Sequence, residues 1–203
     1  MDRDEIISEA ISLVLGVPEA GDTERGEKAF NYSFRLLLSR RSWTFFRDEV
    51  LLTNYEQLDN NSYLYGYRFS LPEDFARCLT VDFDYSSLND VDYGRQLLHG
   101  NNASASKIDY KVSGSHLYTN ANRVHLTYLH KDLAKAGDVS GAFVAALVLQ
   151  TAAFLSIVLK SSVEARREFL REYEHQVHIA VAEDNLNVTN TSRKGAYGFG
   201  GKI

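Results

Sequence analysis

An apolar run of eighteen residues, 142–159, constrains the fold of this chain more than any other feature. Its only polar residues are Gln150, Thr151 and Ser156. A helix that is apolar on all sides either lies at the centre of a soluble protein or spans a membrane, which requires about 20 residues. The Gln150 amide at its midpoint, the many alanines and the lack of a Trp/Tyr belt favour a core helix. We therefore expect the other helices to pack around it.

Three other segments have helical patterns. The first, over residues 4–15, repeats apolar residues at helical spacing: Ile6, Ile7, Ala10, Ile11 and Val14. The second begins near Asp22 or Thr23 and has its apolar side at Phe30, Phe34, Leu37 and Leu38. The last opens with a Ser161/Glu164 capping box, carries Phe169, Tyr173, Val177 and Val181 on one side, and ends near Leu186. The last helix alone cannot cover the 142–159 surface, so a four-helix bundle formed by both ends of the chain is predicted.

The region between the helices has the period of two that is typical of half-buried strands. Alternating apolar residues occur around 65–69, 79–83 and 108–112, and turn residues fill 113–115 and 120–122. We expect about five strands, with a three-stranded meander over 108–129. The fold class is therefore α+β, with a small antiparallel β subdomain inserted into the helical bundle.

The predicted boundaries follow from these patterns. Residues 1–48 and 138–186 form the bundle, and residues 49–137 form the inserted β subdomain. Residues 187–203 contain four glycines, three cations and no acid, and are expected to form a flexible C-terminal tail.

Composition limits the possible functions. The formal net charge of −5 argues against a dedicated nucleic-acid binder, which usually presents a basic face. The single cysteine, Cys78, cannot form an intrachain disulfide. Acids occupy the N-terminal positions where a secretory signal carries positive charge, so a soluble protein made inside the cell is expected.

The sequence contains no phosphate loop, nucleophile elbow, paired CxxC or HExxH motif. His175 and His178 could reach one metal ion, but no third ligand is spaced to join them, so a solvated helix face is the simpler interpretation. The strand-region histidines His116, His125 and His130 are predicted to be exposed, and Cys78 to be a small buried residue. We predict no enzymatic activity, no metal and no cofactor. A carboxylate pair for glycoside cleavage remains the one enzymatic alternative, and the 27 acids do not single out such a pair.

Three segments resemble the tail tubular protein A family, the head-to-tail adaptors of short-tailed, podovirus-type bacteriophages. They are SWTFF at 42–46 followed by VLLT at 50–53, the LPEDFxRxLxV pattern at 71–81, and YKVxGxxLYTN at 110–120 followed by VxLxY at 124–128. The apolar helix and the charged helix after it also fit, so the resemblance covers most of residues 1–186. The approach to the apolar helix, residues 132–138, lacks the proline expected at that junction.

This resemblance implies a structural virion protein, made in the host cytoplasm, which forms a dodecameric ring beneath the portal. Its partners would be the portal protein, a nozzle of the tail tubular protein B type, tail fibres and passing DNA that is not specifically bound, with no membrane involved. For the portal side we predict Arg193, Lys194, Tyr197 and Phe199, although the tail could equally have no role. For the nozzle or fibre side we predict Asn101, Asn102, Ser113, Gly114, Asn120 and Asn122. Two rival functions are a tail-associated cell-wall (peptidoglycan) hydrolase and a nucleic-acid-binding scaffold.

Overall fold

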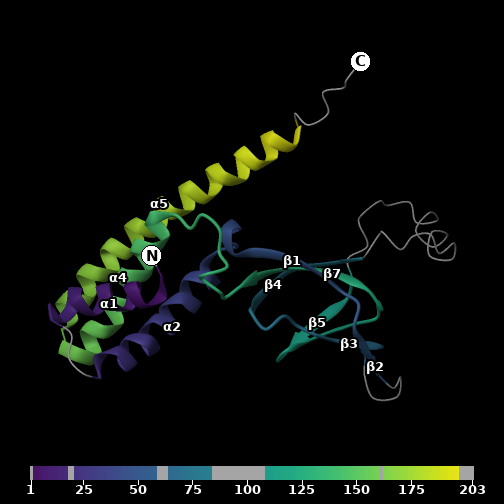
Figure 1. Ribbon diagram of the computed structural model, residues 1–203, viewed down its shortest axis with the longest axis horizontal. Helices are drawn as coiled ribbons and strands as arrows, with labels where there is room; N and C mark the ends of the chain where they lie inside the picture. The colour runs from purple at the N-terminus through teal and green to yellow at the C-terminus, as the bar shows by residue number, and fades with distance from the viewer. Residues whose placement is uncertain (1, 18–20, 59–63, 84–107, 161, 197–203) are drawn as a thin grey trace. The chain divides into compact units, whose positions relative to one another are not determined.

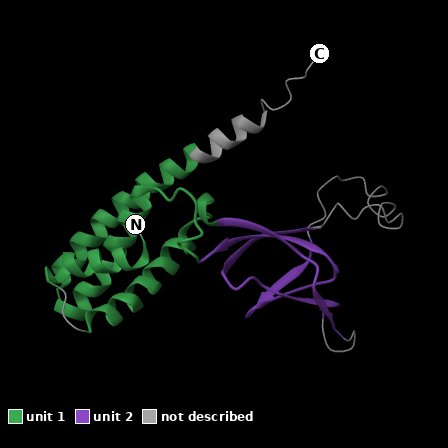
Figure 2. Cartoon of the chain, in the orientation of Figure 1, with its two compact units in different colours: residues 1–46, 132–203 green, residues 47–131 purple. Residues whose placement is uncertain are grey.

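The computed structural model describes residues 2–17, 21–58, 64–83, 108–160 and 162–196. The chain divides into two compact units, drawn in separate colours in Figure 2. The helical unit consists of residues 1–46 and 132–203, so it is assembled from both ends of the chain. The β unit consists of residues 47–131.

The helical unit begins with α1 (Arg3–Leu15) and α2 (Asp22–Arg40). Asp2 and Glu5 form a capping box at the start of α1, and Gly16 ends this helix at a positive φ of 78°. All five apolar residues predicted to face the core of α1 are buried. For α2 no side chain caps the first turn: Gly21 is the N-cap, and Asp22 is a buried residue inside the helix.

A glycine sets how closely α1 and α2 approach each other. A Cβ atom placed on Gly26 would lie 2.6 Å from Ile7 Cγ2 and 3.0 Å from Ile11 Cδ1. Real Cβ contacts are not this short, so any larger residue at position 26 would push the two helices apart.

Helix α4 (Gly141–Lys160) is the central helix of this unit and contacts α1, α2 and α5 (Val163–Ala196) (Figure 1). The Ser140 hydroxyl accepts the Phe143 N–H at 3.1 Å and caps its first turn. By length and composition α4 could cross a membrane, but 56% of its most apolar window is buried within the protein. Burial against three helices favours the core position predicted from the sequence.

Helix α5 differs from its prediction at both ends. The Ser162 hydroxyl caps it by accepting the Ala165 N–H at 3.2 Å, whereas Ser161, the predicted cap, lies outside the described residues. The helix continues through Ala196 rather than ending near Leu186. The prediction that the tail leaves helical structure at residue 187 was therefore wrong: Asn, Thr and Val have only weakly unfavourable helix propensities, and none of them stops a helix as Gly or Pro does.

An aromatic cluster lies where the helical unit leads into the β unit along the chain. The short helix η1 (Thr44–Phe46) follows α2, and Trp43 and Phe46 are fully buried. Both rings pack against Phe143 of α4, with centroid distances of 5.1 and 5.4 Å. The aromatic residues that follow α2 thus form a separate turn held against the core helix.

The β unit contains two antiparallel sheets. One has the order β1-β7-β4, with β1 (Arg47–Leu52), β7 (Val124–His130) and β4 (Phe75–Phe83). The other has the order β2-β3-β6-β5, with β2 (Tyr55–Gln57), β3 (Tyr67–Ser70), β6 (His116–Thr119) and β5 (Tyr110–Ser113). Residues from both sheets form one core, whose buried members are Phe69, Val81, Ile108, Leu117, Val124, Leu126 and Tyr128.

The predicted three-stranded meander was wrong. Strands β5 and β6 do form a hairpin, and Gly114 in its turn has the positive φ of 59° that such tight turns require. However, β6 pairs with β3, whereas β7 pairs with β1 and β4 in the other sheet. The alternating pattern identified each strand but gave no information about its partner, because pairing depends on residues distant in sequence.

The α+β class is confirmed by the four helices and the two antiparallel sheets of the described residues. Seven strands occur in the described part of the chain, compared with about five predicted. The short β2 strand was the most difficult to foresee, since its three residues are all exposed and show no alternation.

Candidate functional site

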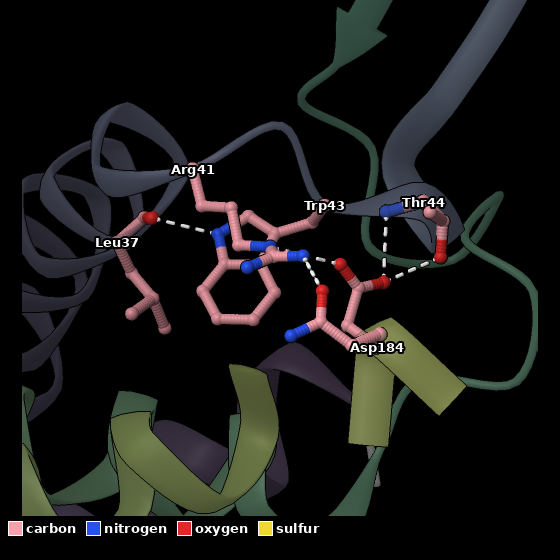
Figure 3. Close-up of polar contacts among 6 residues, drawn as sticks. Leu37, Arg41, Trp43, Thr44 and Asp184 are labelled. Atoms are coloured by element: carbon pink, nitrogen blue, oxygen red, sulfur yellow. Dashed lines mark hydrogen bonds and ion pairs between the residues drawn. The ribbon is translucent and has the colours of Figure 1, made fainter. Parts of the chain in front are cut away.

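A buried carboxylate joins α5 to the segment that follows α2 (Figure 3). Asp184 has a side-chain exposure of 0%, and its oxygens accept hydrogen bonds from Arg41 Nε at 3.1 Å and from the Thr44 N–H at 3.0 Å. The Thr44 hydroxyl also donates to this carboxylate, and the Arg41 guanidinium donates to Asn185 Oδ1. Together, Asp184, Arg41, Thr44 and Asn185 are called the Asp184 cluster below.

The Asp184 cluster lies beside the only tryptophan of the sequence. The indole N–H of Trp43 donates to the Leu37 carbonyl at 2.8 Å, so the chain folds back onto the end of α2 (Figure 3). Trp43 is completely buried, and Thr44 is the first residue of η1. The cluster therefore fixes the backbone just before β1 begins.

This arrangement is suited to anchoring rather than to proton transfer. The Asp184 oxygens accept three hydrogen bonds and are withdrawn from solvent, so they are committed to holding the chain rather than open to a substrate. The cluster was not predicted from the sequence, although a signal was present. Asp184 continues the buried side of α5 formed by Tyr173, Val177 and Ala180, and a lone acid on a buried stripe usually has a fixed partner.

A second ion pair connects α2 with α5 nearer the surface. Arg40 donates two hydrogen bonds to the Glu174 carboxylate, at 2.7 and 2.6 Å, and its guanidinium lies 4.9 Å from the ring centroid of Tyr173. The hydrogen bond from Arg40 lowers the pKa of Glu174, while burial raises the pKa of the Tyr173 hydroxyl. Both partners of the ion pair are about half exposed, so its contribution is about 0.2–1 kcal/mol.

In the β unit, two carboxylates meet at one tyrosine hydroxyl. The distances from Tyr128 Oη to Asp74 Oδ1 and to Asp48 Oδ2 are 3.1 and 3.4 Å. These three residues come from the turn before β4, from β1 and from β7, so they join the central strand to both neighbours. Because the tyrosine ring belongs to the core, we interpret this pair of acids as structural, and it does not by itself favour glycoside cleavage.

Cys78 is half-buried on β4, and its Sγ lies 3.7 Å from the Tyr110 hydroxyl on β5. Burial raises the pKa of the Cys78 thiol, and the hydrogen bond with Tyr110 opposes this shift only in part. A raised pKa lowers the thiolate fraction at neutral pH, which argues against a reactive nucleophile.

The histidines differ from the prediction in two cases. His130 is buried with 3% exposure, so its predicted exposure was wrong, because it ends the central strand β7 and pairs with Phe75. His116 was also predicted to be exposed, but it is half-buried because it begins β6, which pairs with strands on both sides. His125 is exposed, as predicted, and His175 and His178 are exposed on α5. Among the described residues no group of three or more His, Cys, Asp or Glu side chains could hold a metal ion.

The predicted docking residues do not gather at one place. Ser113 and Gly114 are exposed at the β5–β6 turn, whereas Asn120 and Asn122 are exposed beyond the other end of β6. Asn120 also has a structural role, because its side-chain oxygen accepts the Gly66 N–H at 2.8 Å. The backbones of Arg193 and Lys194 belong to α5. Asn101, Asn102, Tyr197 and Phe199 lie outside the described residues.

Comparison with protein-family models and with curated protein sequences finds no match to this chain. Its function must therefore be inferred from the residues and their arrangement.

Proposed function

We propose that this chain is a structural virion protein, a head-to-tail adaptor whose copies form a ring between the portal and the tail nozzle of a short-tailed bacteriophage. One observation supports the proposal most strongly: a helical unit built from both chain ends carries a separately packed β unit as an insertion. A protein that must join two different partners benefits from two contact modules with separate cores.

The segments that resemble the adaptor family fall on the parts of the fold that define this architecture. The first segment supplies Trp43, η1 and the second half of β1, which is the passage from one unit into the next along the chain. The second supplies β4, and the third supplies β5, β6 and the start of β7.

In the proposed ring, passing DNA would meet a protein with an acidic net charge of −5. Contacts that neutralise phosphates strengthen binding in a salt-dependent manner, so a conduit works better with few of them. The adaptor would also act without a cofactor, since its role is to hold two assemblies together.

The test uses an affinity-tagged form of the chain to capture the portal protein of the same virus. The eluted complex is then imaged by negative-stain electron microscopy. The proposal predicts rings of the chain on one end of the portal. Loss of turbidity when the chain acts on purified peptidoglycan would favour the hydrolase instead, and salt-sensitive retention on DNA would favour a nucleic-acid-binding scaffold. Either result without portal capture would refute the adaptor function.

A further inference from the structure

Two exposed apolar surfaces of the helical unit carry charges of opposite sign. We call the first the α5 outer face: Glu168, Glu172, Ile179, Glu183 and Leu186. We call the second the α2–α4 face: Lys28, Tyr32, Arg35 and Leu36 of α2, with Phe154 and Val158 of α4. Both lie within the same unit and are formed by different residues.

On the α5 outer face, Ile179 is 36% exposed and Leu186 is 62% exposed. They are seven residues apart, as are Glu172 and Ile179, so all three lie along one side of the helix, turned away from its buried stripe. Glu168 and Glu183 flank this side and make no hydrogen bond or ion pair with any described residue. This side of α5 therefore combines two exposed apolar side chains with acids, and it complements a surface that combines apolar side chains with cations.

On the α2–α4 face, Tyr32 is 54% exposed although its ring packs edge-on against Phe154, with the centroids 4.7 Å apart. Leu36 follows Tyr32 by one turn and is 37% exposed, and Val158 follows Phe154 by one turn and is 60% exposed. Two cations of α2 border these side chains. Lys28 is paired with Glu24 on the same helix, whereas Arg35 has no ion pair within the described part of the chain.

We propose that the α5 outer face of one copy packs on the α2–α4 face of the next copy. Three acids then meet Lys28 and Arg35, while Ile179 and Leu186 cover Tyr32 and Val158. Since one copy can use both faces at once, the contact repeats from copy to copy, as a ring requires. This inference rests on the proposed ring and adds the surfaces that would close it.

The test measures self-association of the full chain by sedimentation velocity over a concentration series at low salt. Arg35→Glu and Glu183→Arg should each weaken association at least tenfold, because each places like charges in contact. The double variant R35E/E183R restores opposite charges and should return most of the lost affinity. Ile179→Ser should weaken association without changing its salt dependence.

Matched controls come from the β unit. Lys111→Glu and Glu73→Arg reverse exposed charges outside both faces and should leave association unchanged. Fluorescence of the buried Trp43 shows whether the helical unit of each variant remains folded, and far-ultraviolet circular dichroism reports on both units. Effects of similar size in the controls, or no recovery in the double variant, would overturn the assignment of these faces.

The outcomes also separate this inference from the function on which it rests. If the variants of Arg35, Ile179 and Glu183 still form rings on the portal, the proposed contact between copies is wrong, but the adaptor function is not contradicted. A wild-type chain that stays monomeric, with and without the portal, would overturn both.

Discussion

Removal of the Asp184 carboxylate should destabilise the helical unit more than loss of any exposed acid. In Asp184→Ala, the Thr44 N–H, the Thr44 hydroxyl and the Arg41 guanidinium lose the acceptor that they share. Removing one partner of a fully buried ion pair costs about 3–5 kcal/mol. Arg41 is 30% exposed and can regain water, so we expect a loss of about 2–4 kcal/mol in the free energy of unfolding.

The assay is urea unfolding followed by tryptophan emission. Trp43 is the only tryptophan and lies next to Thr44, so excitation near 295 nm would report on the helical unit and not on the β unit. Glu9→Ala is the matched control, because this exposed acid of α1 lies outside both proposed faces, has no hydrogen-bond or ion-pair partner among the described residues and should stay within about 0.5 kcal/mol of wild type. If Asp184→Ala fell within the same limit, the reasoning about this cluster would be refuted.

Three further predictions follow from single contacts. Gly26→Ala should destabilise the helical unit by about 1–3 kcal/mol in the same assay, because the new Cβ meets Ile7 at 2.6 Å, while Gly137→Ala, with nothing within 4 Å, should not. The hydrogen bond from Arg40 lowers the pKa of the Glu174 carboxylate. The ion pair therefore stabilises the fold fully above the unfolded pKa of Glu174, near 4.5, and this stabilisation is lost as the pH falls below that value. Wild type should lose more stability than Glu174→Gln between about pH 6 and pH 3. The raised pKa of Cys78 should make its reaction with a disulfide reagent at pH 7 slower than that of free cysteine, and an equal rate would show that the thiol is not shielded.

The helical unit could be predicted well from the sequence because its signals are local. The five apolar residues of α1 and the four of α2 repeat every three to four residues, and all are buried. The central position of α4 followed from its lack of a polar side, since only burial against several helices satisfies such a surface.

Other features could not be predicted because they depend on long-range pairing. The Asp184 carboxylate lies 140 residues from Thr44 in sequence, and no spacing rule connects them. The separation of β6 and β7 into different sheets likewise depends on β3, β1 and β4. The extension of α5 to Ala196 was missed because residues after Leu186 carry no apolar repeat that marks a helix.

Electron cryomicroscopy of the chain bound to the portal of its own virus would show whether the chain is an adaptor. We expect a closed ring of copies on the portal, with α5 of each copy against α2 and α4 of its neighbour. Single copies bound apart from one another, or no binding to the portal, would contradict it.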